Sequence, residues 1–427
     1  MKRKSFDYRS IGHIEFSIPL TNRVKIPSIW KCVISQIAHY ISNLFRHQIA
    51  YPESGEVVFV TQSVNNERTL CPIAERINNC SHKVIRISDF PVTYVYQYAL
   101  KTWPDFLGFY HKNNTEDRLR IRKEFQYFVN APGYRKVYLE YFRRNKGIRI
   151  IVVANDHTIP TRCLIETARE VDIPVVYTQH ASVSEAFPPL HFAYSFLDGR
   201  ESYEKYLKVG DIKGKVVLLG SPRFDDVMPK RLLVTNTSRE AIGVGLSPGD
   251  SLEKALRLCL HIKEKTNKEV IIRPHPRNMP TFDKALLTKH QIEISDSTKE
   301  TSYDFFTRIS VLIANESGIH LDAAIFGIPA ILFNFSNSKV FDWYGFIRQG
   351  LIQFADSFDH VVELINLSKP AAIDKVQYYY AAFKTPYDGH ISETIAAFLE
   401  AEVCKSEAIG FLNDHFVEKE KNVFVIK

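Results

Sequence analysis

The sequence lacks any uninterrupted apolar stretch approaching the ~18–20 residues that a membrane-spanning helix needs. Its charged start has neither the apolar core nor the small-residue cleavage site of a secretory signal. The six cysteines make no Cys-x-x-Cys pair and show no metal-ligand spacing, which suits a reducing compartment better than a disulfide framework. We therefore expect a soluble cytoplasmic protein with no bound metal.

Internal repeats and low-complexity tracts are also missing, so repeat architectures and collagen-like chains are excluded. What is present is ordinary globular material, with 45% hydrophobic and 24% charged residues to build cores and surfaces. A chain of 427 residues is long enough for two or three domains, and two is the better expectation.

The net charge of +7 is distributed unevenly along the chain. Residues 1–50 hold eight Lys and Arg against Asp7 and Glu15. Residues 118–149 hold ten Lys and Arg against two acidic residues, and the rest of the chain is acidic overall. The sequence therefore describes a slightly acidic body with two basic patches in its N-terminal third.

Short β-branched runs alternate with helical patterns through the first half of the chain. Alternation at this spacing predicts right-handed βαβ units and a parallel sheet. We expect strands at 56–61, 83–87, 148–156, 173–180 and 215–222, and helices at 161–172 and 195–210.

The alternation restarts after a polar, basic stretch at 228–240. We predict an α/β fold of two doubly wound, Rossmann-like domains that face a cleft. The second series has strands at 241–247, 269–276, 310–314 and 329–335, and helices at 251–266 and 319–327. The expected division is an N-terminal domain at 1–227, a C-terminal domain at 228–375, and a helical tail at 376–427 that packs back on the first domain.

Polar residues follow five of the predicted strands, at the point where each strand ends. Doubly wound sheets bind ligands at the carboxyl ends of their strands, so these residues are candidates for a site. The five segments are Asn155-Asp156-His157, Gln179-His180, Ser221-Pro222-Arg223, Arg273-Pro274-His275-Pro276 and Asn315-Glu316-Ser317-Gly318.

The last of these segments leads into a predicted helix. Ser317 and Gly318 would offer a hydroxyl and free backbone N–H groups at the positive end of the helix dipole, which suits a phosphate. Asp322, about one turn further along, would accept hydrogen bonds from ribose hydroxyls. The alternative is a plain helix cap, with Ser317 capping and Asp322 complementing the dipole.

Two prolines hold the segment 273–276 extended, so His275 cannot belong to a helix. Together with Arg273 and Arg277, it presents cationic and hydrogen-bond donor groups where an anion would bind. These residues are therefore candidates for a ligand site rather than for the core.

The turn after the strand 241–247 is a third candidate for a phosphate contact. It contains Ser247 and Gly249, and the glycine would let the backbone approach a ligand closely. The turn is not a Walker loop, because the Gly-Lys-Ser/Thr signature is absent.

The order of these motifs resembles a known group of enzymes. QH at 179–180, GSPRFD at 220–225, RPHP at 273–276 and a Ser-Gly helix before GIPAI at 327–331 are similar to the GT-B glycosyltransferases of bacterial surface and capsular polysaccharides. That group includes CMP-sugar enzymes with a His-Pro motif, the sialyl and Kdo transferases, and the related CDP-glycerol transferases. The resemblance covers roughly residues 148–350, and the ESG helix alone also occurs in nucleotide-sugar 2-epimerases.

The resemblance implies that the C-terminal domain holds the nucleotide. Matched by motif, His275 and Arg273 would lie at the donor phosphate or nucleotide. Ser317 would bind phosphate, and Asp322 or Glu316 would bind the ribose or the base.

Glycosyl transfer needs a base for the acceptor hydroxyl and a group that stabilises the leaving phosphate. The N-terminal domain offers Asp156, His157 and His180 at adjacent strand ends, although a loop pair that solvates a turn would also explain the first two. His180 or Asp156 is the expected base, and the sequence does not separate them. A retaining enzyme would instead place a carboxylate at the anomeric carbon.

The segment 221–226 adds Asp225 as a further catalytic candidate and Arg223 as a phosphate clamp, and a linker cap is the alternative for the carboxylate. Ala181, beside the catalytic candidate His180, stands where many of the similar enzymes have glycine. No Asp-x-Asp cluster follows a strand, so we expect no obligatory metal or other cofactor.

The basic segment 118–149 interleaves its cations with aromatic residues. It would fit an anionic membrane surface, a polyanionic glycan acceptor or a plain solvated helical face. We expect no nucleic-acid binding, because no recognised module accompanies the segment. The segment 28–48 has apolar residues at helical spacing, and it predicts a core or domain-crossing helix rather than a membrane anchor.

These observations predict a glycosyltransferase that moves a sugar from a CMP-Kdo or CMP-sialic-acid type of donor to a bacterial surface polysaccharide or lipid-linked glycan. The alternatives are a CDP-glycerol-type glycerophosphotransferase, a nucleotide-sugar 2-epimerase, and a non-catalytic scaffold that binds glycan or nucleotide. The expected location is the cytoplasm, with peripheral attachment to the cytoplasmic face of the inner membrane as an option.

Overall fold

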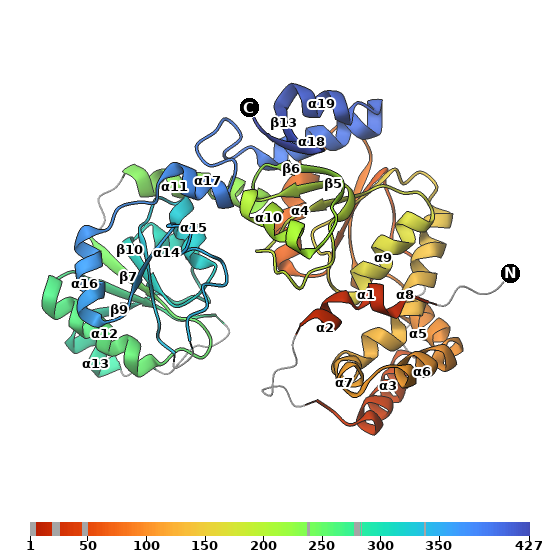
Figure 1. The fold of residues 1–427 in the computed structure, drawn as a ribbon, viewed down its shortest axis with the longest axis horizontal. Helices are drawn as coiled ribbons and strands as arrows, with labels where there is room; N and C mark the ends of the chain where they lie inside the picture. Colours follow the sequence, from red (N-terminus) through yellow and green to blue (C-terminus); the bar gives the residue numbers. More distant parts are fainter. Residues whose placement is uncertain are drawn as a thin grey trace. The chain divides into compact units, whose positions relative to one another are not determined.

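The structure is a computed structural model, and it describes residues 6–18, 26–44, 50–236, 240–276, 282, 284–336 and 339–427. Arg277, one of the cations predicted beside His275, lies outside these residues. The chain divides into two compact units, which Figure 1 shows. Unit 1 contains residues 1–223 and 390–427, and unit 2 contains residues 224–389.

Unit 1 is built on one eight-stranded sheet in the order β13-β14-β6-β5-β4-β3-β1-β2. All neighbouring strands are parallel except β13 and β14, which form an antiparallel hairpin. β1 is buried along its whole length, as expected for a parallel strand covered on both faces. The strands are β1 (Val57–Thr61), β2 (His82–Arg86), β3 (Ile150–Val153), β4 (Val175–Thr178), β5 (His191–Leu197), β6 (Lys213–Leu218), β13 (Phe416–Glu420) and β14 (Val423–Ile426).

The helix predicted at 195–210 is wrong in its first part. Residues 191–197 form β5, and the helix begins only at Arg200. Phe196 and Leu197 are fully buried in the sheet, which suits the aromatic-rich sequence of this strand. The helices between the strands are α4 (Val64–Ala74), α9 (Ile159–Glu170) and α10 (Arg200–Val209).

A helical layer precedes β3 and packs on α9 through the long helix α8 (Figure 1). Gly133 of α8 allows a close approach of α5, because a Cβ there would lie 2.1 Å from the Val95 carbonyl oxygen. The layer contains α1 (Tyr8–Ile11), α2 (His13–Ser17), α3 (Ile29–Leu44), α5 (Val92–Lys101), α6 (Trp103–Lys112), α7 (Thr115–Lys123) and α8 (Phe125–Arg144).

Helix α3 corrects the prediction for the segment 28–48. It contacts α5 and α8 within unit 1, so it does not cross between domains. Only part of it is core, because Trp30, Ile34, Ile37 and Ile41 are exposed while Cys32 and Tyr40 are buried. Residues 45–49 of that segment lie outside the described residues.

Unit 2 contains a six-stranded, wholly parallel sheet in the order β12-β11-β10-β7-β8-β9. Numbered from β7, this is the order 3-2-1-4-5-6 of dinucleotide-binding Rossmann folds. The three-residue edge strands β9 and β12 were not predicted. The strands are β7 (Ala241–Gly245), β8 (Val270–Arg273), β9 (Ile292–Ile294), β10 (Ile309–Ala314), β11 (Ala330–Phe333) and β12 (Gln353–Ala355).

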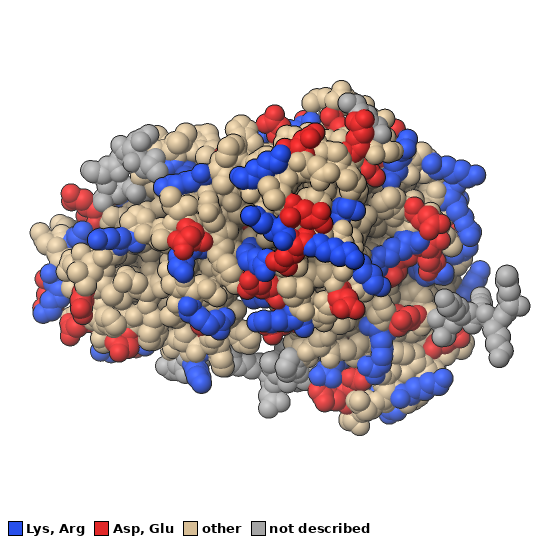
Figure 2. Space-filling view, turned by 45° about the horizontal axis from the view of Figure 1, so that its top comes forward, with Lys and Arg blue, Asp and Glu red and all other residues tan. Residues whose placement is uncertain are grey.

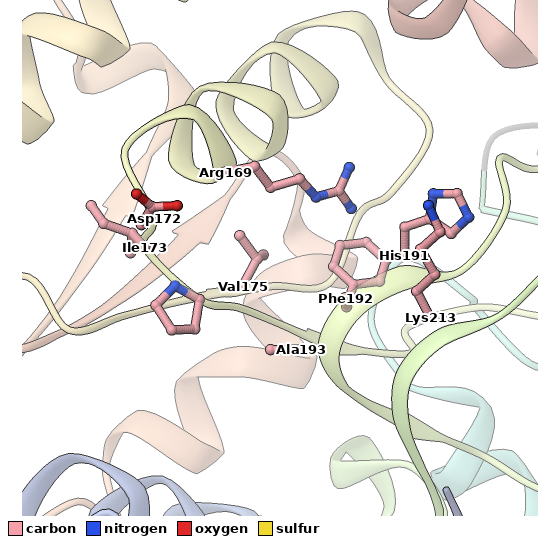
Figure 3. Close-up of a pocket in the computed structure, with 9 residues that line it drawn as sticks. Arg169, Asp172, Ile173, Val175, His191, Phe192, Ala193 and Lys213 are labelled. Carbon is pink, nitrogen blue, oxygen red and sulfur yellow. The ribbon is translucent and has the colours of Figure 1, made fainter. Parts of the chain in front are cut away.

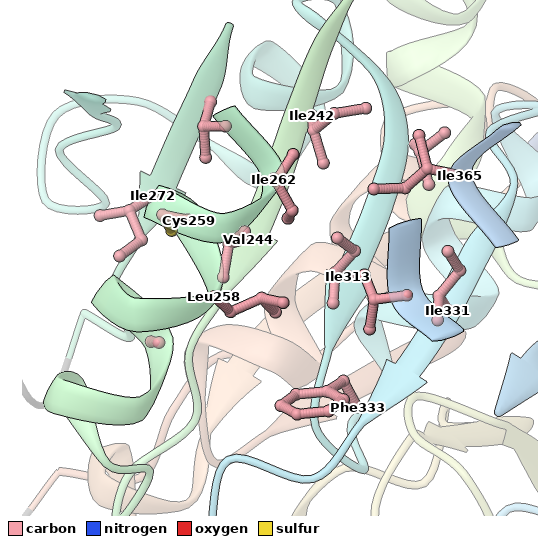
Figure 4. Close-up of a cluster of buried hydrophobic side chains, with 14 of the residues drawn as sticks. Ile242, Val244, Leu258, Cys259, Ile262, Ile272, Ile313, Ile331, Phe333 and Ile365 are labelled. Atoms are coloured by element: carbon pink, nitrogen blue, oxygen red, sulfur yellow. The ribbon is translucent and has the colours of Figure 1, made fainter. Parts of the chain in front are cut away.

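The core of unit 2 follows the alternation of its strands. Ile242 and Val244 of β7 point toward α12 and α16, with buried partners from the neighbouring strands (Figure 4). Gly243 faces the other way, where a Cβ would meet Phe305 of α14. The helices are α11 (Met228–Asn236), α12 (Leu252–Thr266), α13 (Lys284–Lys289), α14 (Ser302–Phe306), α15 (Ile319–Ile325), α16 (Phe358–Leu367) and α17 (Ile373–Tyr379).

The C-terminal tail is helical only in part. It contains α18 (Ile391–Glu400) and α19 (Ala408–His415), but the residues after them form the hairpin β13–β14. Val423 and Phe424 are buried, and β14 pairs with β6, so burial of this apolar run in the sheet explains the strand. The predicted boundaries fell after residues 227 and 375, whereas the two units meet after residues 223 and 389.

Each sheet has one switch point, where the connections leave in opposite directions, and folds of this kind bind ligands at the carboxyl ends of the strands there. In unit 1 it lies between β1 and β3, and in unit 2 between β7 and β10. The prediction of two doubly wound, Rossmann-like domains is confirmed. Within the part of the chain that the structure describes, no helix is long and apolar enough to span a bilayer.

Candidate functional site

The switch point of unit 1 holds a paired aspartate and histidine. Asp156 is 1% exposed, and its Oδ1 lies 2.9 Å from His157 Nδ1. Tyr206 of α10 donates to its other carboxylate oxygen at 2.6 Å, and Tyr177 lies 3.3 Å from the same hydroxyl. Because a carboxylate only accepts hydrogen bonds, Nδ1 carries the proton and Nε2 is the basic nitrogen of His157.

A turn built by Asn155 fixes this pair. Its side-chain oxygen accepts the backbone N–H groups of His157 and Thr158 at 3.0 and 3.1 Å. Gln62, which directly follows β1, accepts from the hydroxyls of Thr158 and Thr161 at 2.5 and 3.0 Å. These bonds join the two strands of the switch point, and neither Gln62 nor Tyr206 was singled out from the sequence.

His180, at the end of β4, lies beside His157. Their rings are nearly parallel, with centroids 6.1 Å apart, and Phe187 stacks on His157 at 4.5 Å. Burial lowers the pKa of His180, and the neighbouring His157 and Arg223 lower it further, so the imidazole is neutral at pH 7. The structure therefore brings together three of the predicted residues, namely Asp156, His157 and His180, and the charge of Arg223 acts on the pKa of His180.

Helix α2 adds two groups that the sequence reasoning missed. Burial raises the pKa of Glu15 to about 7, with a smaller contribution from the charge of Glu124, while His157 and Lys123 oppose the shift. Glu15 Oε2 is buried and has no hydrogen-bond partner among the described residues. Burial also lowers the pKa of His13, on which the charge of Asp156 acts in the opposite direction. The only signal in the sequence was that Glu15 is one of two acids in a basic segment.

The switch point of unit 2 is bridged by a polar contact between its two strand ends. Asn315 donates to Asp250 Oδ1 at 2.6 Å, and Asp250 Oδ2 accepts the backbone N–H of Ser247 at 2.7 Å. Burial raises the pKa of Asp250, which these two bonds oppose. Gly249 has φ +93°, and open space surrounds the position of a Cβ, so its left-handed turn points into an accessible region. His320, fully buried, donates to the Asn315 carbonyl at 3.0 Å and supports the same turn.

Glu316 holds a loop that follows β11. Its carboxylate accepts the backbone N–H groups of Phe341 and Trp343, whose side chains are 58% and 69% exposed. Ser317 accepts from the Ile319 N–H at 3.4 Å. Gly318 precedes the seven-residue helix α15 with helical backbone angles.

Asp322 is half-buried on α15, and its predicted contact with a ribose stays a prediction.

Arg273 is engaged by groups of unit 2. Its guanidinium donates to Ser295 Oγ at 2.6 Å and to the Glu300 carbonyl at 2.9 Å, and it lies over the ring of Phe305. Arg273 is 8% exposed. Its hydrogen bonds link the end of β8 to the segment before α14. His275, two residues later, is half-buried, and its predicted nucleotide contact stays a prediction.

Asp225 is buried and belongs to unit 2, in a 3-10 turn that covers Pro222–Val227. Arg223, in the same turn, belongs to unit 1. The catalytic role expected for Asp225 therefore stays a prediction.

The basic segment 118–149 is partly neutralised in the structure. Arg120 pairs with Glu116 and Asp117, and Arg135 pairs with Glu170 at 2.6 Å. Most of its aromatic side chains are buried in the helical layer, where they form core contacts rather than a stacking surface. These buried side chains are Phe125, Phe128, Tyr138, Tyr141 and Phe142. On the face that Figure 2 shows, basic and acidic side chains are intermingled.

The opposite, amino-terminal edge of the unit 1 sheet has a surface pocket of about 460 Å³ (Figure 3). Arg169, His191 and Lys213 line it together with the apolar side chains of β4 and β5. Among the described residues, no group of three or more His, Cys, Asp and Glu side chains is arranged to hold a metal ion. Metal independence stays a prediction.

Comparisons with known proteins give the fold. No protein-family model matches the chain, and no curated protein matches it. A UDP-N-acetylglucosamine 2-epimerase structure has a TM-score of 0.51 at 15% identity, covering 82% of this chain and 96% of the other. The 2-epimerase of Neisseria meningitidis, bound to UDP-GlcNAc, has a TM-score of 0.51 at 12% identity, with 80% and 99% covered.

A glycotransferase of kitacinnamycin also has a TM-score of 0.51, at 10% identity, with 82% of this chain and 99% of the other covered. At such low identities the likeness concerns the fold alone. This chain is similar over most of its length to enzymes of both kinds, and its two sheets have the Rossmann-like strand orders described above. The protein therefore has the two-domain GT-B architecture.

Proposed function

We propose that this protein is a glycosyltransferase that moves a sugar from a nucleotide donor to an acceptor hydroxyl. The observation that carries the proposal is the Asp156–His157 pair at the switch point of unit 1, with Nδ1 protonated toward the carboxylate. His157 Nε2 makes no hydrogen bond among the described residues, so it is available to accept a proton. This assigns the base to His157, a choice that the sequence left between Asp156 and His180.

In the proposed step, His157 Nε2 takes the proton from the acceptor hydroxyl while its oxygen attacks the anomeric carbon. The bond from that carbon to the donor phosphate breaks, and its electron pair leaves with the nucleotide. Asp156 stabilises the imidazolium that forms, as a buried carboxylate does for a catalytic histidine. Tyr206, through its 2.6 Å hydrogen bond, holds the carboxylate in place.

The nucleotide is assigned to the switch point of unit 2, where Ser247, Gly249 and the turn 315–318 gather at the carboxyl ends of β7 and β10. The motif order favours a CMP-Kdo or CMP-sialic-acid type of donor, with CDP-glycerol as the alternative. The proposed acceptor is a surface polysaccharide or a lipid-linked glycan, and the proposed reaction needs no metal ion or other cofactor. We also propose a cytoplasmic location.

A nucleotide-sugar 2-epimerase is the second candidate, because two of the structures that share the fold are UDP-GlcNAc 2-epimerases. The pKa of about 7 for Glu15 adds a carboxyl group able to exchange a proton near His157, and epimerisation needs both an acid and a base. A non-catalytic scaffold would bind nucleotide or glycan without turnover.

Incubation of the protein with CMP-linked sugars, CDP-glycerol and UDP-GlcNAc, with and without glycan acceptors, distinguishes these functions. The proposal predicts acceptor-dependent release of the nucleotide, unchanged by EDTA. Turnover of UDP-GlcNAc without an acceptor, with solvent deuterium entering the sugar, would establish the epimerase instead. Consumption of none of these donors would contradict both enzymes.

A further inference from the structure

Helix α3 exposes an apolar face to solvent and buries two polar side chains, which is unusual for a surface helix. At 100° per residue, its buried and exposed sets centre on opposite sides of the helix. The buried set is Cys32, Gln36, Tyr40 and Asn43. The exposed set is Trp30 (74%), Ile34 (65%), Ile37 (47%) and Ile41 (53%), which we call the α3 stripe.

Specific contacts fix this orientation of the helix. Gln36 donates to the Asn130 side chain of α8 at 3.1 Å in a fully buried contact. The Cys32 thiol lies 3.6 Å from the carbonyl oxygen of Arg122. The ring of Tyr40 meets that of Tyr96 edge to face, with centroids 5.1 Å apart. Rotation of α3 to bury its stripe would break these contacts. It would also leave the buried side-chain amide of Asn130 without its partner Gln36, so the apolar face is held outward.

Helix α3 itself carries positive charge and no acidic residue. The sequence has no Asp or Glu between Glu15 and Glu53, and Lys31 is exposed on α3 itself. A second copy of this chain would bring the same acid-free helix against itself, whereas an anionic surface would complement it.

We propose that the α3 stripe is a membrane-docking surface that lies in the interface of a bilayer containing anionic lipid. A 16-residue helix is too short to cross the bilayer, which needs ~20 apolar residues, so it would lie flat. Trp30, at one end of the stripe, is the residue type that gathers at the level of the lipid headgroups. The inference moves the membrane contact from the partly neutralised segment 118–149 to α3, and it does not depend on the proposed transferase activity.

Co-sedimentation of the whole protein with vesicles tests the proposal. We expect binding to phosphatidylcholine vesicles that contain phosphatidylglycerol, with weaker binding to phosphatidylcholine alone and in high salt. The double variant Ile34→Ser/Ile37→Ser should lower the partition coefficient at least ~10-fold, because it removes the apolar contact. The matched control Leu207→Ser/Ile409→Ser changes two apolar residues of similar exposure elsewhere in unit 1 and should bind as the wild type does.

Tryptophan fluorescence gives a second readout that does not depend on the variant's stability. The wild-type emission should shift to the blue on the anionic vesicles, and Trp30→Phe should abolish the shift. Equal binding of the stripe variant and the wild type, or no binding to the anionic vesicles, would overturn the proposal. A dimer in solution that Ile34→Ser dissociates would assign the stripe to a second copy and would also overturn it. Activity on a soluble acceptor should be the same in all these variants, so this test fails or succeeds separately from the proposed function.

Discussion

The two switch points have the same place in their sheets but are built from different chemistry. The one in unit 1 gathers ionisable side chains, with the Asp156–His157 pair, His180 and Glu15 mostly shielded from water. The switch point of unit 2 consists of turns, in which Asp250 and Glu316 accept hydrogen bonds from backbone N–H groups. Open space surrounds the position of a Cβ at Gly249. The buried cation of unit 2, Arg273, is held by protein groups.

This difference suits unit 1 to proton transfer and unit 2 to nucleotide recognition. Buried titratable groups with shifted pKa values suit a reaction that moves a proton. Ordered turns with accessible backbone suit a ligand that is held but not chemically changed at that point. Substitution at one switch point, followed by measurement of the property assigned to it, tests whether proton transfer and nucleotide recognition are separated in this way.

Removal of the proposed base should have the largest effect. His157→Ala is expected to lower kcat by ~10²–10⁴-fold, because general base catalysis contributes that much, while the affinity for nucleotide stays unchanged. Steady-state kinetics and calorimetric titration measure the two quantities. The control His191→Ala removes a histidine from the amino-terminal edge of the same sheet and should retain the wild-type rate. A rate loss of the same size in both variants would contradict the assignment.

Replacement of Arg273 should destabilise unit 2 rather than weaken nucleotide binding selectively. Arg273→Met leaves Ser295 and the Glu300 carbonyl without their donor, which should cost about 3 kcal/mol of unfolding free energy. Urea denaturation followed by fluorescence measures the change. Arg257→Met, on the exposed side of α12, should change the stability by less than ~0.5 kcal/mol. A stable Arg273→Met protein that has lost nucleotide binding would instead make Arg273 a ligand contact.

Glu15 should make the stability depend on pH. Its pKa of about 7 in the folded protein exceeds the ordinary value of 4.5, so the folded state keeps a proton that the unfolded chain has lost. The stabilisation is fully present below the unfolded value and is lost as the pH rises through about 7, an effect of about 3 kcal/mol. Glu15→Gln should flatten this part of the stability curve, whereas Glu75→Gln, at an exposed carboxyl, should leave it unchanged. An identical pH dependence in the wild type and in Glu15→Gln would refute the assignment.

The smallest effect is expected at the phosphate turn of unit 2. Ser317→Ala should weaken nucleotide binding by about 5-fold, the loss of one hydrogen bond of about 1 kcal/mol. The control Ser310→Ala changes a serine near the amino-terminal end of β10, the strand that leads into this turn. Ser310 donates to the Ala241 carbonyl, and the variant should bind nucleotide as the wild type does. If Ser317→Ala binds nucleotide with unchanged affinity, Ser317 only caps its turn.

The fold was predictable wherever a strand is a long buried run. The segments that became β1, β3, β7 and β10 are rich in branched apolar residues, and their predicted carboxyl ends lie within three residues of the observed ones. The edge strands β9 and β12 are three residues long, and such segments carry too few residues for a periodicity.

Side-chain direction could not be predicted in the same way. Arg273 and His157 both lie at or just after strand ends, but only the structure shows that one turns toward protein acceptors and the other toward Asp156. Glu15 was missed because its pKa depends on burial by residues that are distant in the sequence. The helical spacing of apolar residues in α3 could be recognised in the sequence. That spacing does not predict which face of the helix is buried, because the contact of Gln36 with Asn130 decides it.

Hydrogen–deuterium exchange with and without nucleotide tests the central claim most directly, because it locates the bound nucleotide in one of the two units. CMP, CDP, UDP and GDP would each be added to the wild-type protein. The account predicts that at least one nucleotide slows exchange in peptides covering 246–251 and 315–320 of unit 2. Protection confined to the segments around Asp156 and His180, or no change with any of the four nucleotides, would contradict it.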